Sequence, residues 1–241
     1  MSDSRSIDAS PAMPAMLAGG LMAAFLLVAI GPTLIADQLV RAQWVLQPHN
    51  DVAYVELSMG AFLLSALLIG GLGLLLRPVP WLPLRLRLVV GSYVPLFVVW
   101  TVFLIVYLRA MHAMGHGVSP QFGLLYFSKH GPTSWGFLVV ALATTLGAPL
   151  AEEVLFRGYL QTLLRVWLGP RVTIPLVGIL FGLMHGLEYA LPITLLGIYF
   201  AWLRERSGSL LPSMLAHALH NGIAVLVTTC WPQTLVWMYP Q

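Results

Sequence analysis

The sequence predicts an all-α membrane protein, a polytopic bundle of about seven to eight transmembrane helices. Of the 241 residues, 59% are hydrophobic and only 9% are charged, whereas soluble domains carry about 25% charged residues. The mean hydropathy is +0.85. The apolar residues are gathered into runs long enough to cross a bilayer as an α-helix, which takes about 20 residues.

The spanning helices are expected in seven apolar stretches separated by short polar segments. The first follows Arg5 and lacks a clear small-residue cleavage site, so we expect a helix rather than a cleaved signal peptide. The fifth and sixth are short for a span. An eighth is expected if the last stretch, WPQTLVWMY, re-enters the membrane. The seven stretches are 15–36, 53–76, 88–109, 135–164, 172–187, 190–204 and 209–229.

No repeat, low-complexity tract or long linker divides the chain, so residues 1–241 are expected to form a single membrane domain. Lys and Arg are enriched in cytoplasmic loops. With the N-terminus inside, eight arginines lie on the cytoplasmic side, and Arg41, Arg109 and Lys129 lie outside. The chain is compact and shows no evident organelle-targeting feature. We therefore expect a multi-pass protein of a bacterial cytoplasmic membrane with its N-terminus inside.

Charge and cysteine content exclude several classes of function. The net charge of +3 is small, and the basic residues lie at helix ends and in short loops, so nothing indicates a nucleic-acid partner. The single cysteine, Cys230, excludes an intramolecular disulfide and a zinc site built from several cysteines.

Two adjacent carboxylates and an arginine interrupt the fourth apolar stretch, in the sequence PLAEEVLFRGYL. A charge at the centre of a membrane helix costs roughly 2.5–3.5 kcal/mol, so such groups usually face the bundle interior and have partners. Glu153 precedes Arg157 by four residues, the favourable order for an ion pair within a helix. Glu152 points about 100° away from Glu153 and lacks that partner. We therefore expect a structural pair, Glu153–Arg157, and an available carboxylate, Glu152.

Polar residues able to meet Glu152 occur on two later stretches. His185 lies in FGLMHG on the fifth, and His217 and Asn221 stand four apart in HALHN on the seventh, hence on one helix face. His220, three residues after His217, leans toward the same face. At 1.5 Å per residue these groups reach similar depths, so we expect one site in the middle or inner half of the membrane. The alternative is that they only make hydrogen bonds between helices.

The other histidines are expected to be solvated. Three of them lie in 110–134, the longest polar interruption, and their spacing matches no metal motif. His49 is interpreted in the same way. Glu188, three residues after His185, is expected at the membrane interface rather than in the site. The three loop histidines are His112, His116 and His130.

At these residues the chain resembles the CPBP family, also called Abi. This family comprises type II CAAX prenyl endopeptidases and bacteriocin-processing or self-immunity membrane proteins. Its signature is EExxxR, then FxxxH, then HxxxN or HxxxD. The resemblance covers 135–229, the expected catalytic core, and leaves 1–134 as accessory helices without a motif. The three motifs fall at Glu152-Glu153-Arg157, at Phe181-His185 and at His217-Asn221.

The resemblance implies an intramembrane endopeptidase. Glu152 would activate the attacking water with the assistance of His185. His217 and Asn221 would polarise the scissile carbonyl and hold its oxyanion. The ion pair would hold the fourth helix, and Phe181 would be structural as well. Such groups suit the reaction because water needs a base and because donors aimed at an oxyanion contribute strongly to the rate.

The role of a metal stays open, since the family is often described as metalloproteases. Glu152, His185 and His217 would be the ligands of a zinc ion that leaves a fourth position for water. However, the chain has no HExxH pair, and a zinc-bound Glu152 would not be free to act as the base. We therefore expect water activated by glutamate without a required cofactor, with zinc as the alternative.

The expected partners are the lipid bilayer and a membrane-associated protein or peptide substrate. The substrate would present a C-terminal sorting tail, a lipidated terminus or a bacteriocin leader. One alternative function is a non-catalytic immunity or partner-binding membrane protein of the same fold. Another is a proton-coupled transporter, since Glu and His inside the membrane also form proton relays. Such transporters often contain internal repeats, and the sequence shows none.

Overall fold

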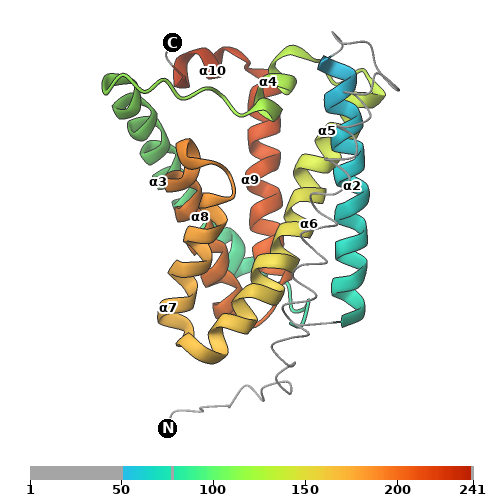
Figure 1. The fold of residues 1–241 in the computed structure, drawn as a ribbon, viewed down its shortest axis with the longest axis vertical. Helices are drawn as coiled ribbons and strands as arrows, with labels where there is room; N and C mark the ends of the chain where they lie inside the picture. Colours follow the sequence, from blue (N-terminus) through green and yellow to red (C-terminus); the bar gives the residue numbers. More distant parts are fainter. Residues whose placement is uncertain (1–50, 77–78, 240–241) are drawn as a thin grey trace.

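The structure is a computed structural model that describes residues 51–76 and 79–239. These residues form helices and the turns between them, without a β-strand among them, so the predicted all-α bundle is confirmed there (Figure 1). The first predicted span, 15–36, lies outside the described residues, as does His49. The predicted total of seven to eight spans therefore stays a prediction.

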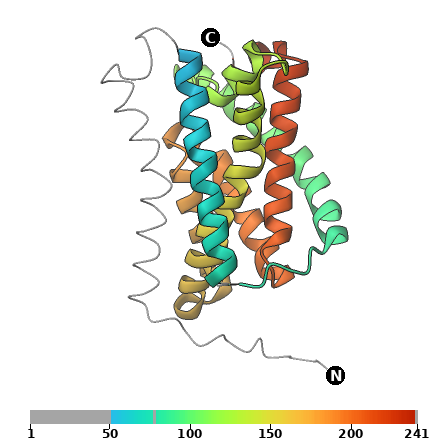
Figure 2. The same cartoon turned by 90° about the vertical axis from the view of Figure 1, so that its right-hand side faces the viewer.

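The long helices follow the predicted apolar stretches closely. Helix α2 spans Asp51–Leu76 and α3 spans Leu86–Ala113. Helix α8 spans Leu187–Ser207 and α9 spans Leu211–Cys230. Helix α2 packs against the helix that begins at Trp135, whereas α3 packs against α8 and α9. The two therefore cover different sides of the bundle, and α3 stands apart from α2 beyond α9 (Figure 2).

A helix with several segments carries the acidic motif. It comprises five consecutive elements and reverses its direction inside the last of them, at Gly169, at the bottom of Figure 1. Gly169 has φ 67° and ψ 168°, a conformation that is essentially open only to glycine. The predicted fourth and fifth helices therefore join at a single residue rather than across a loop. The elements are α5 (Trp135–Leu142), η1 (Ala143–Gly147), α6 (Ala148–Glu152), η2 (Glu153–Leu160) and α7 (Gln161–Leu183).

Two of these elements, η1 and η2, are π-helical and lie on either side of α6, the short helix that ends at Glu152. A π-helix has hydrogen bonds from i to i+5, and such segments frequently occur at functional sites. Pro149 has no backbone N–H, so it cannot donate to the carbonyls of Thr144 or Thr145 one turn earlier. This leaves a carbonyl group beside the acidic motif available to another helix.

Close contact between α7 and α8 is made by glycines. A Cβ atom on Gly178 would lie 2.7 Å from the backbone nitrogen of Ile198, and one on Gly197 would lie 2.9 Å from the carbonyl oxygen of Gly178. Real Cβ atoms essentially never come this close. Small residues of this kind let membrane helices approach backbone to backbone, and here they bring the Gly197 carbonyl toward the acidic motif.

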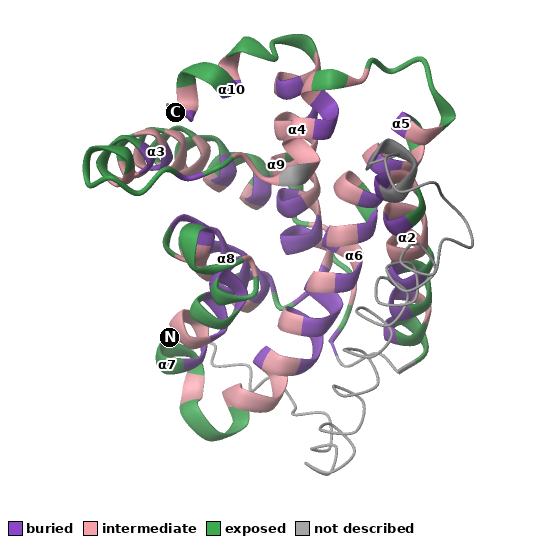
Figure 3. Ribbon diagram, turned by 45° about the horizontal axis from the view of Figure 1, so that its top comes forward, coloured by how far each residue is buried: buried purple, intermediate pink, exposed green. Residues whose placement is uncertain are grey.

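Four helical stretches of the described chain are long and apolar enough to cross a membrane by length and composition. They are Val55–Leu75, Leu86–Ala113, Trp135–Leu183 and Leu211–Cys230. Figure 3 shows exposed residues on the outside of α3 and buried residues between the inner helices. Apolar residues at every fourth position of α3 are exposed, which suits a helix in contact with lipid. These residues are Val90, Val94, Val98, Val102 and Val106.

Basic residues gather at the end of the bundle that contains Gly169, as the predicted charge distribution requires. Arg165 Nε donates to Glu205 Oε1 at 2.6 Å, and Arg85 Nε donates to the carbonyl oxygen of Ser207 at 3.1 Å. These contacts place the ends of α3, α7 and α8 together. The direction in which the bundle crosses a membrane stays a prediction.

The segment 110–134 is more ordered than the polar interruption that the sequence predicts. It contains a short helix, α4 (Phe122–Lys129), and buries Tyr126 and Phe127. A second short helix, α10 (Gln233–Met238), follows α9 within the predicted re-entrant stretch. Both lie at the end of the bundle opposite Gly169 (Figure 1). The apolar residues of FGLLYF supply the buried side chains, and the sequence interpretation missed this amphipathic signal.

Candidate active site

The predicted ion pair between Glu153 and Arg157 is present. Arg157 Nη1 donates to Glu153 Oε1 at 2.9 Å, and both side chains are fully buried. Arg157 Nη2 donates to the Gly197 carbonyl oxygen at 3.0 Å, which ties η2 to α8. The centre of the guanidinium lies 4.3 Å from the ring centroid of Phe181. The pair thus links η2 with α7 and α8.

Glu153 has a second partner that the sequence interpretation missed. His217 Nδ1 lies 3.0 Å from Glu153 Oε1. An ionised carboxylate only accepts hydrogen bonds, so Nδ1 carries the proton and Nε2 is the atom left for other contacts. The ring of Phe200 stacks on His217 with centroids 4.7 Å apart. Motif spacing gives no sign of this contact, because it depends on how closely α9 approaches η2.

The orientation of His185 is fixed by its own helix. Its Nδ1 lies 2.9 Å from the carbonyl oxygen of Phe181. A carbonyl oxygen only accepts, so Nδ1 is again the donor and Nε2 is left available. Phe181 therefore contributes its backbone to His185 and its ring to Arg157. The FxxxH spacing serves the first contact, since residues four apart lie on one face of a helix.

The free nitrogens of both imidazoles face Glu152. His217 Nε2 lies 3.9 Å and His185 Nε2 lies 4.0 Å from Glu152 Oε2. These separations are too long for direct hydrogen bonds. Within the described chain Glu152 Oε2 is buried and has no hydrogen-bond partner. Three acceptor atoms, Glu152 Oε2, His185 Nε2 and His217 Nε2, thus face the space between them when both imidazoles carry their proton on Nδ1. We call this space the gap; it suits a hydrogen-bond donor such as water, or a cation.

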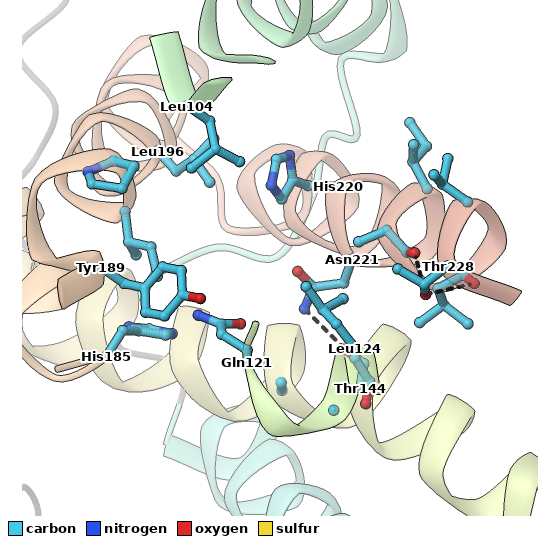
Figure 4. A pocket seen from close by; sticks show the side chains of 18 of the residues that line it. Leu104, Gln121, Leu124, Thr144, His185, Tyr189, Leu196, His220, Asn221 and Thr228 are labelled. Atoms are coloured by element: carbon cyan, nitrogen blue, oxygen red, sulfur yellow. Dashed lines mark hydrogen bonds between the residues drawn. The ribbon is translucent and has the colours of Figure 1, made fainter. Parts of the chain in front are cut away.

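Asn221 lies in the wall of the same cavity. Its Nδ2 donates to the carbonyl oxygen of Thr144 at 2.9 Å, the region that Pro149 leaves without a helical donor. One amide hydrogen of Asn221 and its Oδ1 remain for other contacts. His220 is turned toward α3, where its Nδ1 lies 3.3 Å from Tyr93 Oη. It therefore forms another part of the wall rather than joining His217 (Figure 4).

A cavity of about 470 Å³ opens beside these residues. Its wall includes Glu152, His185, His217 and Asn221, and the rest is mostly apolar, contributed by α2, α3, α4, α8, α9 and α10. A second, more open pocket lies at the α4 end and shares Gln121, His185 and Tyr189 with the cavity. The structure thus brings all four predicted catalytic residues to one cavity, with the Nε2 atoms of both histidines within 4.0 Å of Glu152 Oε2.

The donors do not fit a tetrahedral zinc ion as they stand. Ligand atoms about 2.0–2.2 Å from zinc in a tetrahedron lie about 3.3 Å apart. The 3.9 and 4.0 Å separations from Glu152 Oε2 to the imidazole nitrogens would require angles of roughly 140–150° at the metal, far from the tetrahedral angle. No group of three His, Cys, Asp or Glu side chains among residues 51–76 and 79–239 has the arrangement of a metal site.

The remaining predicted residues lie away from the cavity. His112 and His116 are exposed, as predicted, whereas His130 is partly buried, stacked on Tyr126 at 4.5 Å. Glu188 is exposed and lines the outer pocket.

Comparison with known proteins finds a similarity in part of this chain. A family model for type II CAAX prenyl endopeptidase Rce1-like proteins matches residues 134–223. No curated protein and no solved structure gives a match. The matched segment holds all three motifs, so the resemblance to the CPBP family is confirmed. Together with the four apolar helices, this match indicates a membrane protein.

Proposed function

We propose that this protein is an intramembrane endopeptidase that hydrolyses a peptide bond of a membrane-associated protein or peptide by water activated by Glu152. The observation that carries the proposal is the convergence of Glu152 Oε2, His185 Nε2 and His217 Nε2 on one gap. The match to a CAAX prenyl endopeptidase family model supports the same class of reaction.

In this mechanism a water molecule occupies the gap and donates one proton toward Glu152 and the other toward His185. Glu152 removes a proton as the oxygen attacks the scissile carbonyl carbon. Breakdown of the tetrahedral intermediate transfers this proton from Glu152 to the leaving nitrogen. The new carboxyl group and the new amine then leave the site, and Glu152 is ionised again.

The developing oxyanion needs donors, and Asn221 supplies one through its second amide hydrogen. His217 supplies a second donor once Nε2 takes up a proton from solvent, which it returns to solvent when the products leave. Its Nδ1 donates to Glu153, and this hydrogen bond fixes the orientation of the imidazole. Glu153 and Arg157 thus orient His217 in addition to holding the helix. The removal of one oxyanion donor typically costs about 10²–10³ in rate.

The mostly apolar wall suits a membrane-associated substrate. An extended apolar peptide segment or a lipidated terminus would bury its side chains there without leaving charges unpaired. The substrates that we propose are a C-terminal sorting tail, a lipidated terminus or a bacteriocin leader.

A partner-binding protein of the same fold is the second candidate. It would have no use for a carboxylate whose buried oxygen has no partner within the described chain, since such a group costs free energy. Proton transport would use Glu152 and the histidines as a relay. The family match favours the peptidase over both.

The decisive variant is Glu152→Gln, which keeps the shape of the side chain and removes the base. We expect it to insert, to purify as a folded protein and to lose cleavage. The proteins of membranes and culture medium from a strain carrying this variant should contain uncleaved termini that are absent from the parent strain. Glu205→Gln, which lies outside both the cavity and the outer pocket, is the matched control and should leave the cleaved termini unchanged. Near-normal turnover by Glu152→Gln would remove Glu152 from the role of base.

The metal-free mechanism is tested on the purified active protein. Elemental analysis should find no stoichiometric zinc, and exhaustive chelation should leave the activity intact. Stoichiometric zinc, with activity lost on its removal and restored on its return, would make Glu152 a ligand instead of the base.

A further inference from the structure

Gln121 lies where the cavity meets the outer pocket. It is one of three residues that line both, with His185 and Tyr189. In Figure 4 its amide lies between Tyr189 and His185 on one side and Asn221 on the other. Gln121 precedes α4 and lies outside the residues 134–223 that the family model matches. Any function of Gln121 is therefore a feature of this chain rather than of the shared motifs.

The backbone around Gln121 is held firmly over the cavity. Tyr189 Oη donates a hydrogen bond to the carbonyl oxygen of Ser119. The Gln121 carbonyl oxygen accepts from the backbone nitrogens of Leu124 and Leu125 at 2.9 and 3.2 Å, which starts α4. The side chain thus extends from a fixed point, and its position does not depend on a mobile loop.

The Gln121 amide has no protein partner among the described residues, and in the cavity wall the same is true of Glu152 Oε2 and Thr101 Oγ1. Several polar side chains of the cavity wall hydrogen-bond inside the protein. Trp100 Nε1 donates to the Pro192 carbonyl oxygen at 2.9 Å, and His220 contacts Tyr93 Oη. An amide beside an apolar cavity loses free energy unless its donors and acceptor are used, so Gln121 points to a polar occupant.

We propose that Gln121 is a substrate-binding residue whose side-chain amide hydrogen-bonds one peptide unit of the substrate backbone beside the scissile bond. The inference rests on the proposed peptidase function and deepens it. A primary amide has one acceptor and two donors, so it matches the N–H and C=O of a peptide unit. The substrate thereby enters past Gln121 from the α4 end and reaches Glu152 in extended form.

Recognition of a backbone rather than a side chain has a consequence for specificity. Gln121 fixes the register of the peptide relative to Glu152 but does not select its side chains. Selection by side chain then falls to the apolar wall of the cavity.

The test uses the full-length protein in phospholipid vesicles. The probes are quenched fluorogenic peptides copied from a terminus that accumulates uncleaved in the Glu152→Gln strain, with one backbone N–H at a time replaced by N–CH₃. The variants are Gln121→Met, which keeps the length without the amide, and Gln121→Glu, which keeps the acceptors without the N–H donors. Gln233→Met is the control, because Gln233 is exposed on α10 outside the cavity.

We expect Gln121→Met to raise KM about tenfold with kcat changed less than twofold, as for a hydrogen bond made equally in the bound substrate and the transition state. In the unmodified protein, one N-methylated peptide near the cleaved bond should lose about tenfold in kcat/KM. In Gln121→Met the same peptide should show no further loss. Gln121→Glu should fall between Gln121→Met and the unmodified protein, and Gln233→Met should match the unmodified protein.

Two results would overturn the proposal: an unchanged KM in Gln121→Met, or losses from the variant and from N-methylation that multiply. Multiplied losses would mean that the amide only holds water or shapes the wall. The absence of any accumulated terminus in the Glu152→Gln strain would instead refute the peptidase function itself, and with it the substrate on which this inference rests.

Discussion

Replacement of Arg157 by methionine tests whether the buried ion pair holds the catalytic helix. Methionine keeps much of the length and the apolar packing against Phe181 and removes the charge. Two acceptors then lose their donor: Glu153 Oε1 and the Gly197 carbonyl oxygen, now 2.9 and 3.0 Å from the guanidinium. Removal of one partner from a buried pair costs about 3–5 kcal/mol. His217 still donates to Glu153, so we expect the lower end, about 3 kcal/mol.

This loss is measured as the midpoint of thermal unfolding in detergent, followed by tryptophan fluorescence. A few kcal/mol in a chain of this size lowers the midpoint by on the order of 10 °C. The matched control is Arg165→Met, since Arg165 pairs with Glu205 at 2.6 Å but its side chain is 38% exposed. Exposed pairs contribute about 0–1 kcal/mol, so the control should move the midpoint by only a few degrees.

Equal shifts in Arg157→Met and Arg165→Met would refute the reasoning, because burial would then make no difference. A double variant, Glu153→Gln with Arg157→Met, gives a second check. It removes both charges and should recover part of the loss of Arg157→Met alone. Simple additivity of the two single losses would show that the residues are not coupled.

Two further variants address the helix contact and the oxyanion. Gly197→Ala should destabilise the protein, because its Cβ would lie 2.9 Å from backbone atoms of Gly178. The control is Gly91→Ala on α3, whose Cβ would have nothing within 4 Å and which should be neutral or stabilising by about 0.5–1 kcal/mol. Thermal unfolding compares the two variants, and equal effects would contradict the close contact. Asn221→Ala should lower kcat about 10²- to 10³-fold with the fold retained; a loss below tenfold in the peptide assay would take Asn221 out of the oxyanion site.

The sequence predicts much of the fold, because hydropathy decides where a chain crosses a membrane. The apolar stretches from 53–76 onward match the observed helices within a few residues at most ends. The prediction was less accurate where local geometry decides. Gly169 reverses the chain in one residue, whereas the seven residues between the two predicted helices, RVWLGPR, suggest a loop. Helix α4 was missed because its eight residues are too few to span a membrane and lie inside a polar segment.

In the site, too, contacts within one helix can be predicted from the sequence, whereas contacts between helices cannot. The pairing of Glu153 with Arg157 is local, so the i to i+4 spacing predicts it correctly. The hydrogen bond from His217 to Glu153 joins residues 64 apart, and no pattern within one helix contains that information. The π-helical turns beside Glu152 also escape prediction, since the rotation argument assumes a regular α-helix. Gln121 carries no motif, and only its place at the border of two pockets distinguishes it.

The glycine contact between α7 and α8 has a mechanical consequence. Helices that touch through backbone atoms at Gly178 and Gly197 separate only by losing that whole contact, so we expect the pair to move as one rigid body. Displacement that admits a substrate should therefore arise at α10. This short helix is held in part by the hydrogen bond from Arg109 Nη2 to the Trp237 carbonyl oxygen, 2.7 Å long, whereas α4 is anchored by the buried side chains of Tyr126 and Phe127.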